Sequence, residues 1–271
     1  MTNTRSFRPT RGLIATVIGV SLSAASLSIV PAAPAPPATG AAWVHQTGGT
    51  ASAARNSSSW AGYVVSSRSA FTSVGAHWTV AAVRCAASTS TQAAVQWVGF
   101  DGWYDKTVEQ GGTEAYCSGT TPVYSAWWEM YPTNQIKQMF SVRPGDVITA
   151  SVTYASRTFN IVVRDVSTGK ALAITAACKA TVTCSRSSAE WIVEAPAYGG
   201  HSASLARWNQ VSFTHTVAST AVNLSTTSGI SAFTNIQVAM TGANGGRDRR
   251  AQPGALTSGG KGFTEAWISA T

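Results

Sequence analysis

Short runs of alternating apolar and polar residues, each followed by a turn signal, fill the chain after about residue 60. Alternation with a period of two is typical of a strand with one buried face, and Pro144-Gly145-Asp146 and Ser167-Thr168-Gly169-Lys170 are tight-turn sequences between such runs. No stretch of ten or more residues in this region has a convincing helical period. The clearest runs are 73–80, 147–154, 158–165, 210–217, 235–240 and 263–269. The pattern predicts an all-β protein, an antiparallel sandwich or barrel.

The first 35 residues have the order of an export signal. Arg5, Arg8 and Arg11 precede an apolar run over 13–30, which ends in a small-residue, proline-rich segment. A charged region, an apolar region and a small-residue cleavage zone in that order are typical of a secretory signal peptide. Serines within the apolar run make an uncleaved membrane anchor the less favoured alternative. We therefore predict a signal peptide over 1–35 and a secreted protein with no stable membrane association.

The segment 36–58 is rich in Pro, Ala, Gly and Ser and has no period. This composition favours a linker or a short pro-segment. We expect the folded domain to occupy 59–271, because this length suits one large all-β domain and the chain has no internal repeat. Nothing in the sequence indicates an oligomer, so we expect a monomer.

Charge is scarce in this chain. It has 11 Asp and Glu against 19 Lys and Arg, and 16 basic residues remain without the three arginines of the predicted signal. A chain this mildly basic is a poor candidate for nucleic-acid binding, and we expect no such partner. The cluster of Arg247, Arg249 and Arg250 lies in a glycine-rich stretch, 242–254, and is interpreted as a solvated loop.

The four cysteines are Cys85, Cys117, Cys178 and Cys184. In an exported protein, an even number of cysteines without C-x-x-C spacing favours disulfides over a zinc site. Three pairings are possible, and we expect Cys178–Cys184 because it would close a short turn, which leaves Cys85–Cys117. A catalytic thiol is less favoured, since no cysteine lies in a recognisable nucleophile context.

The sequence lacks the local motifs of several enzyme classes. It has no H-E-x-x-H of zinc peptidases, no G-x-S-x-G of α/β-hydrolases and no G-x-x-x-x-G-K-[ST] phosphate loop. The histidines are His45, His77, His201 and His215, and none is paired locally with a nucleophile. A Ser-His-Asp triad assembled from distant segments is a less favoured alternative. With so few histidines and carboxylates, we expect no metal and no cofactor.

The informative carboxylates lie in runs that are rich in aromatic residues. Side chains alternate along a strand, so Glu190, Ile192 and Glu194 share one face of the run 189–194. Two carboxylates on one face of a single strand are uncommon in a chain with so few acids.

Two further runs place a carboxylate among aromatic residues. Glu129 shares its face with Trp127 and Tyr131, which predicts a hydrogen-bonding partner for the charge, and Trp97 and Asp101 share parity in the same way. Each run alone also fits the solvent-exposed face of a half-buried strand. Together they favour a groove that stacks on an extended polymer, either peptide or sugar, and in which a carboxyl group can exchange a proton.

Five motifs in a fixed order connect the chain to a known family. They are Ser59-Trp60-Ala61-Gly62, Trp97-Val98-Gly99-Phe100-Asp101-Gly102, Val108-Glu109-Gln110-Gly111-Gly112, Ala126-Trp127-Trp128-Glu129-Met130-Tyr131-Pro132 and Ala189-Glu190-Trp191-Ile192-Val193-Glu194. In order and spacing the chain resembles the glutamic peptidases, the eqolisin family, from about Ser59 to about Gly242. The tail after Gly242 has no counterpart that we can align, and family members typically have a longer pro-segment than the one available here.

The resemblance implies a bent antiparallel β-sandwich of the concanavalin A-like or jelly-roll type, with two large sheets and a concave substrate groove. It also implies a catalytic pair of one Gln and one Glu, which fall by motif on Gln110 and Glu194. The supporting candidates are Glu129 and Asp101 as hydrogen-bond partners of the pair, Trp97, Trp60 and Tyr131 as groove walls, and Glu190.

The function that the resemblance implies is peptide-bond hydrolysis by a secreted endopeptidase, active at acidic pH, insensitive to pepstatin, and acting on protein or peptide substrates. Glu194 would take a proton from a water shared with Gln110 and later deliver it to the leaving amine. The alternatives are a secreted carbohydrate-binding β-sandwich and a jelly-roll glycoside hydrolase. A glycosidase needs two carboxyl groups, whereas Gln110 is not an acid and the adjacent Glu109 has the opposite strand parity.

Overall fold

The predicted alternating runs form strands. Two of them are β10 (Val147–Ala155) and β11 (Thr158–Asp165), which pair antiparallel through a tight hairpin. The hairpin residues Ser156 and Arg157 have φ of 51° and 63°, and positive φ at both central residues matches the natural twist of two paired strands. The predicted all-β class is therefore confirmed.

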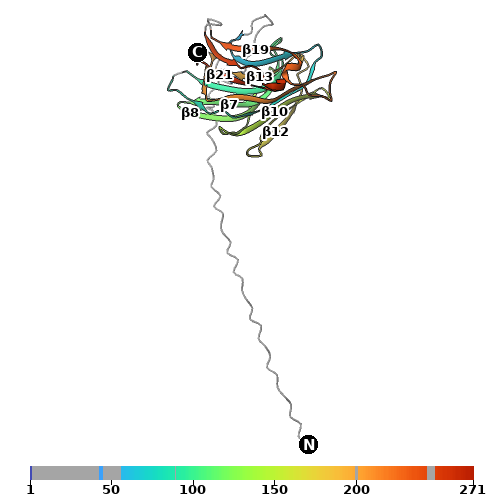
Figure 1. Cartoon of the computed structure of the whole chain (residues 1–271), viewed down its shortest axis with the longest axis horizontal. Helices are drawn as coiled ribbons and strands as arrows, with labels where there is room; N and C mark the ends of the chain where they lie inside the picture. Colours follow the sequence, from blue (N-terminus) through green and yellow to red (C-terminus); the bar gives the residue numbers. More distant parts are fainter. Residues whose placement is uncertain (2–42, 45–55, 89, 199–200, 243–247) are drawn as a thin grey trace. The chain divides into compact units, whose positions relative to one another are not determined.

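The computed structural model describes Met1, Trp43–Val44 and residues 56–271, apart from 89, 199–200 and 243–247 (Figure 1). Nearly all of the predicted signal peptide and linker lies outside these described residues. Two short 3₁₀ turns, Ile230–Ala232 and Ser258–Gly260, are the only helical elements of the described part. No helix in that part is long and apolar enough to cross a membrane.

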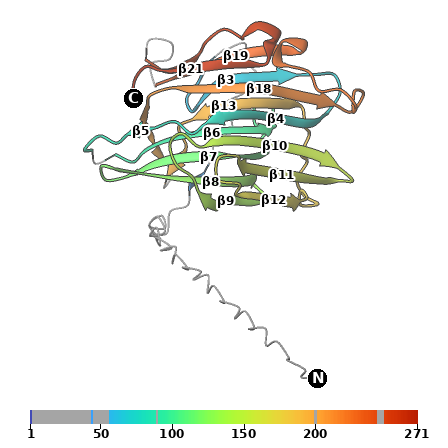
Figure 2. The ribbon, with the colours of Figure 1, turned by 60° about the horizontal axis from the view of Figure 1, so that its bottom comes forward.

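The main strands form two antiparallel sheets that share one hydrogen-bonded edge. The first sheet has the order β19 (Thr234–Thr241), β3 (Trp60–Ser66), β13 (Ser188–Glu194), β6 (Gln92–Phe100), β7 (Val108–Ser118), β8 (Thr121–Tyr131) and β9 (Asn134–Ser141). The second has the order β12 (Ala171–Ala176), β11, β10, β4 (Phe71–Thr79), β18 (Val211–Thr220), β21 (Gly262–Trp267) and β20 (Arg249–Pro253). Pairing of β19 with β20 joins the two sheets. Figure 2 shows β3, β13, β6, β7 and β8 in succession beside β18, β4, β10 and β11.

The main hydrophobic core lies between the two sheets. Trp191 of β13 donates its indole N–H to the carbonyl oxygen of Gly75 in β4 at 2.9 Å, and the Trp78 indole of β4 donates to Thr113 Oγ1 of β7 at 2.9 Å. These bonds satisfy two indole donors in the core while the rings exclude water. Because side chains alternate along β13, burial of Trp191 in this core turns Glu190, Ile192 and Glu194 to the other face of the first sheet.

Short strands extend the fold beyond the predicted domain boundary at residue 59. The strand β2 (Asn56–Ser57) pairs in parallel with β19, and β1 (Trp43–Val44) pairs with β14 (Ala197–Tyr198). Part of the predicted linker therefore forms strands: β2 lies beside the main sheets, and β1 belongs to a separate three-stranded sheet with β14 and β15 (His201–Ser202). The remaining short strands are β5 (Val83–Arg84), β16 (Ser204–Leu205) and β17 (Arg207–Trp208).

Both predicted disulfides are present. Cys178 and Cys184 are bonded within one loop with a Cα–Cα distance of 6.4 Å. Cys85 and Cys117 are bonded with a Cα–Cα distance of 5.5 Å. No described cysteine is left as a thiol.

The prediction of a loop is wrong for Arg249 and Arg250, which lie in a strand, and the prediction of solvent exposure is right for Arg249 but wrong for Arg250. Arg249 and Arg250 belong to β20, and the Arg250 guanidinium is buried and donates through Nη2 to the carbonyl oxygens of Ala203 at 2.9 Å and Ala270 at 3.0 Å. Glycine-rich local composition concealed a strand that is stabilised by pairing with distant residues. Arg247 lies outside the described residues.

Candidate active site

The outer face of the first sheet, turned away from the main core, carries a second cluster of buried apolar side chains. We call this surface the tryptophan face. Its members are Trp60, Val64, Val95, Trp97, Trp103, Val108, Trp127, Ile192 and Val238. By strand parity, Glu129, Glu190 and Glu194 project from this same face.

Gln110 joins this face through the register of β7. It lies opposite Gly99 of β6 and opposite Glu129 of β8, so the Gln110 and Glu129 side chains project from the same side of the sheet. Gln110 Nε2 donates to Glu129 Oε2 at 2.8 Å. Because a carboxylate only accepts, this bond fixes which end of the amide faces Glu129. Gln110 Oε1 is buried and has no hydrogen-bonding partner among the described residues.

Gly99 leaves the room that the Gln110 side chain occupies. A Cβ at position 99 would lie 2.9 Å from Gln110 Cβ and 2.8 Å from the carbonyl oxygen of Glu109. Both distances are shorter than real Cβ contacts, so any larger residue would displace Gln110 or the β7 backbone. A glycine is required here by the close approach of neighbouring strands.

Glu194 is held by the aromatic layer. The Trp97 indole N–H donates to Glu194 Oε2 at 2.9 Å. Trp97 in turn packs edge-to-face on Trp60 with 4.8 Å between ring centroids, and Trp60 is stacked with Trp103 at 6.5 Å. A rigid ring that donates to an oxygen of Glu194 limits the rotamers the carboxylate can adopt.

The burial of these side chains excludes the alternative that they lie on the solvent-exposed face of a half-buried strand. Gln110 and Glu194 have no exposed area, and Glu129 is 1% exposed. A buried charge needs hydrogen-bonding partners, and the bonds from Gln110 and Trp97 supply one each to Glu129 and Glu194. The tryptophan face is therefore a desolvated site with oriented polar groups.

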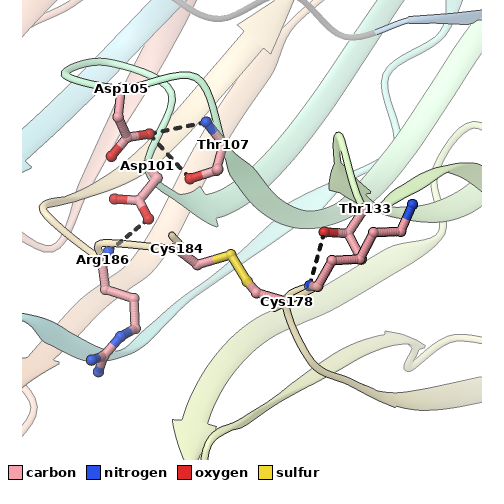
Figure 3. The surroundings of a disulfide bond; sticks show 8 residues. Asp101, Asp105, Thr107, Thr133, Cys178, Cys184 and Arg186 are labelled. Atoms are coloured by element: carbon pink, nitrogen blue, oxygen red, sulfur yellow. Dashed lines mark hydrogen bonds between the residues drawn. A yellow bond between two sulfur atoms is a disulfide. The ribbon is translucent and has the colours of Figure 1, made fainter. Parts of the chain in front are cut away.

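Asp101 has a different role from the one that strand parity suggested. It follows the end of β6 with φ of 67°, which takes its side chain out of the strand alternation. Its carboxylate accepts from the backbone N–H of Arg186 at 2.6 Å and of Ser187 at 2.7 Å, as Figure 3 shows for Arg186. Asp101 therefore fastens the loop after β6 to the segment before β13.

The loop that Asp101 fastens covers part of the tryptophan face. Within it, Asp105 accepts from the backbone N–H and hydroxyl of Thr107, each at 3.1 Å (Figure 3). The same loop carries Trp103, whose ring stacks on Trp60. Asp101 thus helps to fix the loop that carries Trp103.

Tyr131 and Glu190 complete the predicted set. Tyr131 is the half-buried last residue of β8, and its parity places it on the face of Glu129. Glu190 is fully buried on the face of Glu194, and no hydrogen bond of ordinary geometry reaches either of its carboxyl oxygens. Burial raises the pKa of Glu190 well above its usual value; the Ser188 hydroxyl partly opposes this, and the nearby acids Asp101, Asp105 and Glu109 add to it.

Two buried acids of β7 were not among the predicted site residues. Glu114 shares parity with Gln110, and its Oε1 accepts from Ser125 Oγ and from Gln138 Nε2, both at 2.6 Å. The parity argument used for β13 would have found it. Glu109 is fully buried on the opposite face, and burial, followed by the charge of Asp101, raises its pKa well above the usual value.

One grouping of three potential metal ligands occurs within the described residues, and it consists of Glu109 with Cys178 and Cys184. Its two sulfur atoms are bonded to each other, so no thiolate is available to a metal there.

Comparison with known proteins identifies related structures. The model of the peptidase A4 family matches residues 58–245. A crystal structure of scytalido-glutamic peptidase with a transition state analog inhibitor is 21% identical, with a TM-score of 0.65 over 78% of this chain and 98% of the other. SCP-B, a member of the eqolisin family in complex with the tripeptide Ala-Ile-His, is 20% identical, with a TM-score of 0.62 over the same shares.

A third structure, aspergilloglutamic peptidase from Aspergillus niger, is 23% identical, with a TM-score of 0.57 over 65% of this chain and 99% of the other. No curated protein sequence matches the chain. At these identities the solved structures show a shared fold, and the family model covers well over half of the chain. The chain is therefore a member of the peptidase A4 family, the glutamic peptidases or eqolisins.

Proposed function

We propose that this glutamic peptidase is a secreted acid endopeptidase in which Gln110 and Glu194 activate a water molecule on the tryptophan face. The observation that carries the proposal is that both side chains project from one face of the first sheet, where Gln110 donates to Glu129 and Glu194 accepts from Trp97. Catalytic groups held in this way need little reorganisation during the reaction.

The proposed steps use only these groups. Glu194 takes a proton from the attacking water while Gln110 Oε1, which has no described partner, accepts the second water hydrogen. The water oxygen adds to the peptide carbonyl, and the Gln110 Nε2 hydrogen that is not bonded to Glu129 donates to the resulting oxyanion. Glu194 then delivers its proton to the amine nitrogen as the C–N bond breaks.

Tyr131, half-buried beside Glu129, is the aromatic residue that an extended substrate would contact in this proposal. Trp60 and Trp97 are fully buried and support Glu194 from below. An acidic working pH follows from a carboxylate that must act as base and then as acid. The proposal of secretion rests on the signal-like order of residues 1–35.

The test is hydrolysis of a denatured protein by the purified mature domain from acidic to neutral pH, with pepstatin and a serine-peptidase inhibitor present. Glu194→Gln and Gln110→Ala should each lower kcat roughly 10²–10⁴-fold with an unchanged circular dichroism spectrum. Glu265→Gln is the control, because it makes the same substitution at another buried Glu, on β21 in the second sheet, and it should retain activity.

An active, correctly folded Glu194→Gln variant would refute the catalytic assignment. Inhibition of the wild type by pepstatin would refute the proposed inhibitor profile. Binding of glycans without cleavage of any protein, at every pH tested, would favour a carbohydrate-binding function for the tryptophan face instead.

A further inference from the structure

Two of the histidines meet on the outer face of the second sheet. The rings of His77 in β4 and His215 in β18 are stacked, with 4.5 Å between centroids and 27° between planes. His77 alternates with the core residues Ala76 and Trp78, so its ring points away from the main core. The pair therefore lies on the opposite side of the sandwich from the tryptophan face.

A local distortion of β18 produces this meeting. Thr214 lies directly opposite His77, so in a regular strand the next residue, His215, would point to the other face. The register shifts between Thr214 and Val217, and His215 has φ of 51°. A bulge of this kind re-aims a side chain, and left-handed backbone at a non-glycine residue is costly enough to cluster at functional sites.

Neighbouring hydrogen bonds orient the His215 ring. Thr214 Oγ1 lies 3.4 Å from the carbonyl oxygen of His77, to which it can only donate, and 3.4 Å from His215 Nδ1. The hydroxyl therefore contacts Nδ1, and Nε2 is the ring nitrogen left for a metal. A metal-binding imidazole commonly makes a hydrogen bond through its other ring nitrogen.

The pair borders a pocket of about 720 Å³. Its lining includes Asn209, Ser212 and Thr214 from the described residues, together with a turn at Pro144 and Gly145, and no carboxylate. A metal here would have two imidazole ligands and would complete its coordination with water. Imidazole without thiolate or carboxylate suits nickel, copper and zinc rather than calcium or magnesium.

We propose that His77 and His215 form a binding site for one divalent transition-metal ion of the nickel, copper and zinc group, with one ring nitrogen from each histidine. The site is separate from the peptidase chemistry, because it lies on the other sheet. The metal would bridge β4 and β18.

The experiment is titration of the mature protein with NiCl₂ by isothermal calorimetry at about pH 6.5, where a large share of imidazole is neutral. The wild type should bind one Ni²⁺. His77→Ala and His215→Ala should each weaken binding by about tenfold or more, and Thr214→Val by up to about tenfold through loss of the oriented ring. His201→Ala is the control, because His201 is exposed on β15, outside the pocket lining.

A second measurement on the wild type does not depend on variants that fold. Substoichiometric Ni²⁺, which is paramagnetic, should broaden the ring-proton signals of His77 and His215 before those of His201. Any of three results would overturn the proposal. They are the absence of Ni²⁺ binding, the same affinity in all the variants as in the wild type, and equal broadening of the signals of all three histidines.

Discussion

The stability of this domain should fall steeply as the pH rises above about 5. Three glutamates, Glu109, Glu190 and Glu265, are buried, and no hydrogen bond of ordinary geometry reaches their carboxyl oxygens. Burial is the largest cause that raises the pKa of each well above its usual value. In the folded state these three groups keep a proton that an unfolded glutamate, with a pKa of about 4.3, has lost.

The sign and size follow from this difference in bound protons. The folded state binds more protons than the unfolded state between the unfolded and folded pKa values, so the free energy of unfolding decreases as pH rises through that window. Each retained proton contributes a slope of about −1.4 kcal/mol per pH unit, so three contribute about −4 kcal/mol per unit. Asp101, whose pKa is raised by burial to about 6, steepens the slope further. The loss of stability should begin as the pH rises past the unfolded glutamate pKa of about 4.3 and continue until the raised folded-state pKa of each glutamate is passed.

The assay is urea unfolding at about pH 4.5, 5.5 and 6.5, followed by the fluorescence of the ten tryptophans. Glu109→Gln, Glu190→Gln and Glu265→Gln should each reduce the size of the slope by about 1.4 kcal/mol per pH unit, and the triple variant should keep only the smaller slope contributed by Asp101. The measured quantity is the slope of the free energy of unfolding against pH. A buried amide changes that free energy by the same amount at every pH, so it does not change the slope. A wild-type stability that is flat or rises with pH, or single variants with the full wild-type slope, would refute the reasoning.

Three substitutions test how the site is held. Gly99→Ala should lower kcat by a larger free-energy equivalent than it lowers the free energy of unfolding, because the new Cβ, 2.9 Å from Gln110 Cβ, displaces the amide. Steady-state kinetics measure the first effect and urea unfolding the second. An unchanged kcat would contradict this prediction. Trp97→Phe keeps a ring but removes the donor to Glu194, and should lower kcat/KM about 10–100-fold, equivalent to about 1.5–3 kcal/mol. Asp101→Asn keeps a residue that tolerates left-handed backbone, but its amide cannot accept from both backbone N–H groups as the carboxylate does. The free energy of unfolding in urea should fall by about 1–3 kcal/mol. An unchanged free energy of unfolding would show that other contacts hold the loop.

The sequence carried enough information for the fold class and the faces of the strands. Alternation placed Glu190 and Glu194 together and Glu109 on the other side from Gln110, and the registers of β13 and β7 agree with both assignments. The cysteine pairing was also predictable, since a short loop closes readily. Local pattern is informative here because the two-residue period follows directly from strand geometry.

Other features depended on contacts between distant residues. Strand alternation predicted that Asp101 shares a face with Trp97, but a positive φ at that position directs its carboxylate to the backbone of Arg186 and Ser187. No local sequence pattern reveals these partners. Arg250 looked like a loop residue because its two carbonyl acceptors are far away in the sequence. The segment around Asn56 looked like a linker because its pairing strand, β19, comes nearly two hundred residues later.

The sequence by itself therefore determined an all-β chain, the order of its motifs and the residues that can share a face, because strand periodicity is a local property. Only the tertiary structure decided that Gln110 and Glu194 are desolvated and held by Glu129 and Trp97, and that His77 meets His215. Burial, register and bulges arise when distant strands pack together, and they set the hydrogen bonds and the pKa values on which the proposed chemistry depends.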